Sequence, residues 1–301
     1  VIEIDKSLVS RVEGLRFHAS NKTQRRVDLE KAFAREEDTK EEIKLIKTMK
    51  VEMYNNISKK YNEFLSGFDL KYDGEVVPIQ QYRPIFIEDD TKGGRWYNVS
   101  GGVQTLPRSL RGGLTIDGEK LSEVDYKEMH PRMLMQELYN DGNKDVAKLV
   151  KSGVRFNPYA MHSLEGTNLK EEDARVAAKL ALLICLNAKD RRSAVFAVRK
   201  KYREEGLCRT ISVPNVVSRV VESNLIIKDF LFSGEGVYLQ NRDSYIMATI
   251  LNTCVNRGIP VLPYHDGVLV KDSDKGKVKE IFEDSWEKSY RSKVFCEVEV
   301  S

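Results

Sequence analysis

Two short segments of this chain each place an aspartate at the end of a run of residues that favours β-strand. Asp125 follows the run Leu-Ser-Glu-Val, and Asp266 follows a longer run that begins at Ile259. Two carboxylates at the ends of adjacent strands can hold a pair of divalent metal ions. This feature constrains the fold most, because it requires two segments that are distant in the sequence to meet in one sheet.

Each segment also has a simpler interpretation. Asp266-Gly267 between apolar runs is a strong signal for a type I′ hairpin turn. An aspartate after a short strand, such as Asp125, is often a cap or turn residue. Neither aspartate alone therefore indicates a metal site, and the residues between the two segments are needed to decide.

The sequence predicts a helix between the two segments, over residues 171–188. The helix begins with three acidic residues, where the helix dipole favours negative charge, and continues with strong helix formers. Arg175 and Lys179 are four residues apart, so they project from one face. Two neighbouring cations can grip a triphosphate. An amphipathic helix with a solvated basic edge would show the same pattern.

These segments resemble, in the correct order, the polymerase core of family A DNA polymerases, a group that also includes the single-subunit phage-type RNA polymerases. The first family motif is a metal-binding Asp followed by Tyr, and Asp125-Tyr126 matches it. The second is Arg-x3-Lys on a helix, which Arg175 and Lys179 match. The third is a His-Asp pair at a hairpin turn, which His265-Asp266 matches. The resemblance implies template-directed nucleotidyl transfer.

Flanking sequences extend the resemblance to roughly residues 91–271. Arg95 and Gln104 lie in a stretch that resembles one whose arginine contacts the primer. Gln240 begins a segment similar to the helix that precedes the third motif. The resemblance implies that these three residues bind the primer–template nucleic acid, partly through the minor groove, where readout is degenerate and suits a general copier. His265 is expected to position the primer terminus.

The resemblance further implies a two-metal mechanism. Asp125, Asp266 and the backbone carbonyl of Tyr126 would hold two Mg²⁺ ions roughly 3.5–4 Å apart, and Mn²⁺ can substitute. Arg175 and Lys179 would bind the triphosphate of the incoming nucleotide. Lys179 would also protonate the leaving group, which makes it the third expected catalytic residue.

Some expected nucleotide-binding positions depart from the family pattern. His130 stands where the DNA polymerases often have a Glu that crowds the sugar 2′ position. Leu183 and Asn187 replace two aromatic residues that shape the same site. With Tyr126 and Tyr159, which is expected near the phosphates, they complete the nucleotide-binding set. Looser packing weakens a steric gate, so a DNA polymerase with reduced preference for deoxyribonucleotides is expected.

The implied fold class is α+β, a right-hand polymerase with an antiparallel β palm and helical thumb and fingers. The expected regions are a helical thumb-like region (1–75), a first palm part with Asp125 (76–150), reduced fingers with the motif helix (151–221), and a second palm part with the His-Asp hairpin (222–301). Within the first region, an apolar stripe predicts a helical hairpin over about 24–66. The stripe consists of Ile43, Ile46, Met49, Met53 and Ile57.

Composition is compatible with this interpretation without requiring it. The 301 residues carry a net charge of only +3, so nucleic-acid binding must come from local patches, the clearest being 189–192 and 199–203. Four cysteines without CxxC spacing indicate reduced thiols and an intracellular, cytoplasmic protein. No apolar run is long enough to span a membrane. A monomer, encoded by a phage or another mobile element, fits these features.

Three alternatives remain open at this point. A ribonucleotide-using RNA polymerase or primase fits the same motifs. A His-Asp phosphohydrolase would need further histidine ligands, and the chain has only four histidines. A non-catalytic nucleic-acid-binding module would have no need of both aspartates and the Arg-Lys pair. Because only about 90 residues precede the matching region, a minimal polymerase without a proofreading exonuclease is expected.

Overall fold

The computed structural model describes residues 33–35, 42–43, 45–78, 80–99, 103–207 and 211–301. The chain divides into two compact units. The first, here called the sheet unit, comprises the described residues of Val1–Lys127 together with Gln240–Ser289 and Glu297–Ser301. The second, here called the helical unit, comprises Glu128–Leu239 and Tyr290–Cys296.

The sheet unit contains a small sheet with the strand order β2-β1-β5-β6. Its strands are β1 (Phe33–Arg35), β2 (Glu42–Ile43), β5 (Tyr82–Ile87) and β6 (Asp89–Asn98). Strand β1 pairs with β5 in parallel, and the other two pairs are antiparallel. The alternating burial along β5 shows that one face of this sheet is covered.

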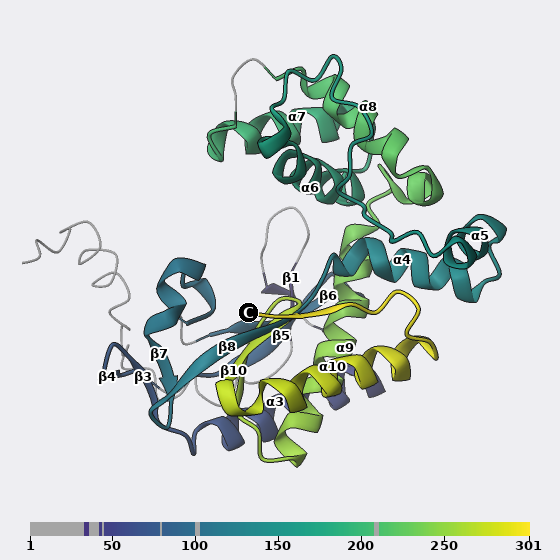
Figure 1. Ribbon diagram of the computed structural model, residues 1–301. Helices are drawn as coiled ribbons and strands as arrows, with labels where there is room; N and C mark the ends of the chain where they lie inside the picture. The colour runs from purple at the N-terminus through teal and green to yellow at the C-terminus, as the bar shows by residue number, and fades with distance from the viewer. Residues whose placement is uncertain (1–32, 36–41, 44, 79, 100–102, 208–210) are drawn as a thin grey trace, which may run out of the picture. The chain divides into compact units, whose positions relative to one another are not determined.

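A larger, seven-stranded antiparallel sheet carries the segments of interest. Its order is β4-β3-β7-β8-β10-β9, and β11 also pairs with β8. The strands are β3 (Leu70–Tyr72), β4 (Glu75–Val76), β7 (Leu114–Ile116), β8 (Glu119–Tyr126), β9 (Val261–Tyr264), β10 (Gly267–Lys271) and β11 (Val298–Val300). The hairpin that the sequence predicted around His265-Asp266 is therefore confirmed as β9–β10 (Figure 1).

Three helices form the core of the sheet unit with these strands: α3 (Met49–Leu65), most of α9 (Gly236–Asn256) and α10 (Lys275–Tyr290). Helix α3 begins after Thr48, whose hydroxyl accepts a hydrogen bond from the Val51 backbone N–H. Tyr54 and Tyr61 are fully buried on its core face. The Tyr54 hydroxyl lies 2.9 Å from the Ser244 hydroxyl of α9, so the helices are joined by a polar contact inside an aromatic core.

The predicted helical hairpin over 24–66 is wrong in the part that the structure describes. Strands β1 and β2 lie in this region, followed by the single helix α3. The predicted stripe is also wrong as a core face, because Ile46 is 78% and Met49 is 87% exposed. The prediction gave most weight to Ile and Met, whereas the buried face is built around tyrosines whose rings pack and whose hydroxyls find partners.

The helical unit is built from α4 (Met129–Asn140), α5 (Lys144–Ser152), α6 (Glu171–Asn187), α7 (Arg191–Glu204) and α8 (Val213–Ser223). Helix α6 coincides with the predicted motif helix and packs against both α7 and α8. The buried Tyr202 hydroxyl of α7 donates to the Ala177 carbonyl of α6 at 2.6 Å. Small residues on α6, such as Ala177 and Ala181, are fully buried at this packing surface.

The α+β class is thus confirmed, with antiparallel pairing dominating the larger sheet. The assignment of palm, thumb and fingers to residues 1–75, 76–150, 151–221 and 222–301 stays a prediction. Within the described residues, no helix combines the length and the apolar character that crossing a bilayer would require.

Candidate active site

Strand β8 delivers Asp125 to one face of the large sheet and Tyr126 to the other. Burial alternates along the strand, with Val124 and Tyr126 buried and Asp125 half-buried between them. The Tyr126 ring packs 4.8 Å from the Phe282 ring of α10, and its hydroxyl donates to the Phe282 carbonyl. The Tyr126 side chain is therefore a core residue, which leaves its backbone carbonyl as the group that can serve as a metal ligand.

The β9–β10 hairpin brings Asp266 next to this strand end. Tyr264 pairs with Gly267, so His265 and Asp266 form the two-residue turn, and His265 has a φ of 52°. The tight turn is thus shifted by one residue from the Asp-Gly turn that the simpler interpretation predicted. The Tyr126 backbone N–H donates to the Asp266 carbonyl at 3.3 Å, which ties the two motif segments together.

Strand register places a row of four residues side by side. Gly267 of β10 and Glu299 of β11 each oppose Asp125 of β8, and Tyr264 of β9 opposes Gly267. Directly opposed residues in antiparallel strands share a face of the sheet. Glu299 is therefore a further carboxylate on the same face of the sheet as Asp125. Sequence reasoning missed it.

Gly267 keeps this row closely packed. A Cβ atom at this position would lie 2.9 Å from the Tyr264 hydroxyl and 3.0 Å from the Val124 carbonyl oxygen. The tyrosine ring therefore reaches across the glycine towards Asp125. No described residue forms a hydrogen bond with the buried Tyr264 hydroxyl. Burial, with the charges of Asp125 and Glu123 next, holds the pKa of Tyr264 well above its usual range, so the hydroxyl stays protonated.

Two arginines near this row of residues form ion pairs with neighbouring carboxylates. Arg111 donates to Glu123 at 2.7 Å and stacks over the Tyr264 ring, with its guanidinium carbon 4.2 Å from the centroid. Arg95, on β6, forms an ion pair with the fully buried Asp243 of α9 and is itself only 17% exposed. Neither Asp243 nor Arg111 was predicted. Arg95 thus joins a strand to a helix as well as being an expected primer contact.

His265 lies at the tip of the hairpin, with its ring 6.3 Å from that of Tyr97. Desolvation and then the positive charge of Arg95 lower the pKa of His265, while Asp266 and Asp243 oppose the shift. The imidazole is therefore neutral near pH 7. A neutral imidazole donates one hydrogen bond and accepts another, which suits it to orienting a hydroxyl.

Gln104 and Gln240, both expected to contact nucleic acid, differ in their surroundings. Gln104 accepts a hydrogen bond from the Asn98 backbone N–H and donates to the Trp96 carbonyl at 2.7 Å. Its amide therefore stabilises the end of β6 through two backbone hydrogen bonds, a structural role that the motif did not predict. Gln240 is half-buried on α9, at the start of the segment that belongs to the sheet unit.

The expected triphosphate residues belong to the helical unit, on one stripe of α6. Arg175 is 56% exposed; it contacts Glu128 at 3.4 Å and lies over the Tyr159 ring, with its guanidinium carbon 5.3 Å from the centroid. Tyr159 itself is buried, so the motif arginine and this loosely assigned tyrosine are brought together. Lys179, one turn further on, is exposed.

The residues expected to shape the sugar site also lie in the helical unit. His130 is 8% exposed, on the first turn of α4. Leu183 is half-buried and Asn187 is exposed, and the Asn187 amide donates to the Leu183 carbonyl at 2.7 Å. The two residues that replace the family's aromatic pair are thus coupled to each other within α6.

The oxygen ligands at these strand ends are too few to enclose a metal ion, and they suit Mg²⁺, which needs few protein ligands. Among the residues that the structure describes, no three His, Cys, Asp or Glu side chains come together in a way that could hold a metal ion. Mg²⁺ commonly uses one or two carboxylates, with waters and substrate phosphates completing its shell. Asp125, Asp266 and the Tyr126 carbonyl supply that minimal set. A His-Asp hydrolase, which needs several protein ligands, finds no such cluster in the described part of the chain.

Comparison with known proteins adds a likeness to solved structures. No protein-family model matches the sequence, and no curated protein matches it. Among solved structures, the chain is similar to the POL domain of Pol1 from M. smegmatis in complex with a DNA primer-template and a dNTP. The TM-score is 0.41 and the sequence identity 14%, over 83% of this chain and 49% of that one. The chain therefore spans about half the length of that structure.

Proposed function

We propose that this protein is a template-directed nucleotidyltransferase, a small DNA polymerase in which Asp125 and Asp266 hold two Mg²⁺ ions. One observation carries the proposal. The register of β10 on β8, with the Tyr126-to-Asp266 backbone hydrogen bond, brings two distant aspartates to one sheet edge. The order of the motifs in the sequence supports the same interpretation.

When bound, the ions would activate a primer 3′-hydroxyl and stabilise the pyrophosphate leaving group. The chain's own residues supply the remaining functions. Asp125 and Asp266 would hold the ions from the ends of paired strands, and Tyr264 adds a protonated hydroxyl beside Asp125. His265, neutral near pH 7, lies next to Asp266 and can orient the primer terminus by hydrogen bonding.

The cations of α6 are assigned to the nucleotide. Arg175 offers a planar fork for phosphate oxygens, and the exposed Lys179 offers a compact charge. Lys179 would also donate a proton to the departing pyrophosphate. To bind phosphate, Arg175 must exchange its contact with Glu128 for contacts with the substrate, and Tyr159 beneath it keeps the guanidinium oriented during that exchange.

Primer extension in the presence of Mg²⁺ tests the proposal. The full chain is incubated with DNA and RNA templates, each with deoxyribonucleotides and with ribonucleotides. We expect template-dependent extension with deoxyribonucleotides. Stronger incorporation of ribonucleotides would replace the DNA-polymerase assignment with an RNA polymerase or primase. A folded protein that binds primer–template but extends it under none of these conditions would overturn the proposal in favour of a non-catalytic binding module.

A further inference from the structure

Helix α7 exposes one face that combines positive charge with a single aromatic ring. At 100° per residue, the face is centred on Phe196 and its members lie within about 60° of it. All of its members are exposed: Arg192, Ser193, Phe196, Arg199, Lys200 and Arg203. Phe196 is 71% exposed, an unusual state for a large apolar side chain on a packed helix.

Little of the positive charge of this face is compensated: Asp190 interacts electrostatically with Arg192. Lys201, on the other side of the helix, is neutralised by Glu205 at 2.6 Å and by Glu204 at 3.7 Å. By contrast, no carboxylate among the described residues forms an ion pair with the four cations of the face. Uncompensated cations raise the local concentration of an anionic partner. The helix therefore separates a neutralised side from a side that is available to a polyanion.

Phe196 takes no part in the packing of α7 against the core. The buried side of α7 is formed by Ala194, Val198 and Tyr202, and the Tyr202 hydroxyl fixes that side to α6. Phe196 lies about half a turn away from these residues and is not needed to close the core. An exposed aromatic ring among arginines is the composition of surfaces that stack the bases of single-stranded nucleic acids.

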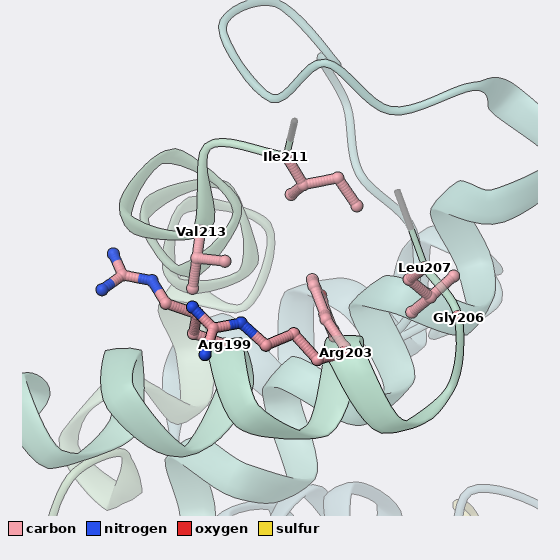
Figure 2. A pocket seen from close by; sticks show the side chains of 7 residues that line it. Arg199, Arg203, Gly206, Leu207, Ile211 and Val213 are labelled. Carbon is pink, nitrogen blue, oxygen red and sulfur yellow. The ribbon is translucent and has the colours of Figure 1, made fainter. Parts of the chain in front are cut away.

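A cleft adjoins this face and shares two of its arginines. It has a volume of about 750 Å³ and is lined by Arg199, Tyr202, Arg203, Gly206, Leu207, Ile211 and Val213. Figure 2 shows the Arg199 and Arg203 side chains along one edge of α7, beside Val213. Guanidinium groups next to an apolar lining suit a ligand with phosphates and a flat apolar body, which is the chemistry of a nucleotide.

We propose that the α7 face and the adjoining cleft bind single-stranded nucleic acid. One base stacks on Phe196, a neighbouring nucleotide enters the cleft, and its phosphates contact Arg199 and Arg203. An anionic membrane is a poorer fit, because membrane-surface helices bury a broad apolar face, whereas the exposed face of α7 has one apolar residue. This site lies in the helical unit and does not depend on the aspartates of the sheet unit.

Fluorescence anisotropy with the full chain and a labelled twenty-nucleotide oligo(dT) tests the stacking contact. The buffer contains EDTA, so the result is independent of metal-dependent chemistry and of the proposed polymerase activity. Phe196→Ala should weaken binding at least about fivefold, the lower end of what one stacked base contributes. The same variant should not change binding of an abasic oligonucleotide of equal length, because that ligand has no base to stack.

Salt dependence tests the binding of phosphates. For single strands the slope of log affinity against log salt falls by about 0.7 for each phosphate that the protein no longer neutralises. Arg199→Ala combined with Arg203→Ala should therefore reduce the slope by about 1.4. Lys201→Ala is the matched control, because it removes one charge from the same helix but from the neutralised side. It should leave both affinity and slope nearly unchanged.

Three results would overturn the proposal. The first is a Phe196→Ala variant that binds oligo(dT) as well as the unmodified protein does. The second is equal loss of affinity in the Lys201→Ala control and the double arginine variant, which would indicate a diffuse electrostatic attraction. The third is competition by phosphatidylserine vesicles as effective as competition by unlabelled oligo(dT), which would favour a membrane surface. Because all substituted side chains are at least partly exposed, matched circular dichroism spectra are expected to confirm folding.

Discussion

The acidic residues at the ends of β8 and β10 and the cations of α6 differ in how firmly the fold holds them. Asp125 and Asp266 are half-buried, and strand register and a backbone hydrogen bond set their positions. Arg175 and Lys179 project from an exposed helix face, and Arg175 is held by an ion pair with Glu128 and a ring contact.

This difference indicates which step each set of residues can control. Groups fixed by strand pairing are preorganised and need no rearrangement at the moment of reaction. Long side chains on an exposed helix lose rotamer freedom only when a ligand orders them. We therefore assign the rate of chemistry mainly to the aspartates and nucleotide affinity mainly to the cations.

The largest effect is expected from the aspartates. Asp125→Asn and Asp266→Asn should each lower single-turnover nucleotide incorporation by several orders of magnitude, because each would remove a principal ligand of the proposed metal ions. Binding of primer–template should persist, since phosphate contacts come from Lys and Arg side chains. Asp117→Asn is the matched control at the exposed turn that begins β8, and it should retain near-normal rates. Normal turnover in either motif variant would remove that aspartate from the centre.

The cations should show a smaller effect of a different kind. Removing one charge-assisted hydrogen bond to phosphate costs about 1.5–3 kcal/mol, or roughly tenfold to a hundredfold. Arg175→Ala should appear mainly in the nucleotide dissociation constant, and Lys179→Ala in both affinity and rate. Pre-steady-state kinetics over a range of nucleotide concentrations separates the two. If both variants match the exposed control Lys148→Ala, α6 has only a solvated basic edge.

A substitution at Gly267 tests whether strand packing holds Asp125 and Asp266 in place before the substrates bind. Gly267→Ala would bring a methyl group against the Tyr264 hydroxyl and the Val124 carbonyl, forcing β10 away from β8. We expect a loss of about 1–3 kcal/mol in unfolding free energy, as for overpacked cores, with a lower incorporation rate. Gly112→Ala, where the added carbon meets open space, should change neither quantity. Denaturant titration and single-turnover rates provide the two measurements.

His130 tests sugar selection. If His130 contacts the sugar as proposed, replacing this bulky residue should relax sugar discrimination by no more than about 1–3 kcal/mol. His130→Ala should therefore lower the ratio of incorporation efficiencies for a dNTP and its matching rNTP, relative to wild type. The exposed His162 provides the control substitution, His162→Ala. An unaltered ratio in a folded His130 variant would show that this buried imidazole supports α4 without contacting the nucleotide.

The smallest effect concerns His265. Its pKa lies below the ordinary value of 6.5 through desolvation and Arg95, and Asp266 partly opposes that shift. Asp266→Asn should therefore lower the pKa of His265 further, as measured by NMR titration. Because the pKa of His265 is lower in the folded state, its contribution to the free energy of unfolding is fully present at pH values above the ordinary pKa. This contribution is lost as the pH falls through the folded-state pKa. His265→Gln should flatten that loss. A rise in the His265 pKa on Asp266→Asn would contradict the proximity of the two groups.

Sequence patterns predicted the elements of the site because those patterns are local. The acidic start and strong helix formers of residues 171–188 are sufficient to predict α6. The run of strand-favouring residues from Ile259 and the Asp-Gly turn signal likewise predicted β9–β10. Asp73-Gly74 and Asp117-Gly118 form turns in which both residues have positive φ, as the Asp-Gly signal suggests. Asp266-Gly267 departs from that pattern, because close packing on Tyr264 and Val124 draws Gly267 into the strand.

Contacts between distant segments could not be predicted in the same way. The proximity of Glu299 to Asp125 depends on which strand β11 joins, and the sequence of a three-residue strand does not specify its partner. The burial of Asp243 beneath Arg95 likewise requires β6 and α9 to meet. The core face of α3 was misassigned because the tyrosines of that helix are buried only when partners for their hydroxyls are present.

Electron paramagnetic resonance with Mn²⁺ in place of Mg²⁺ examines the two-metal centre itself, because it reports on the bound ions without requiring turnover. The sample contains the full chain, primer–template with a blocked 3′ end and a matching dNTP. We predict two bound Mn²⁺ ions per chain with magnetic coupling between them, and loss of that coupling in Asp125→Asn and in Asp266→Asn. Mn²⁺ binding that is uncoupled in the wild type, or unchanged in both variants, would contradict a two-metal centre at these strand ends.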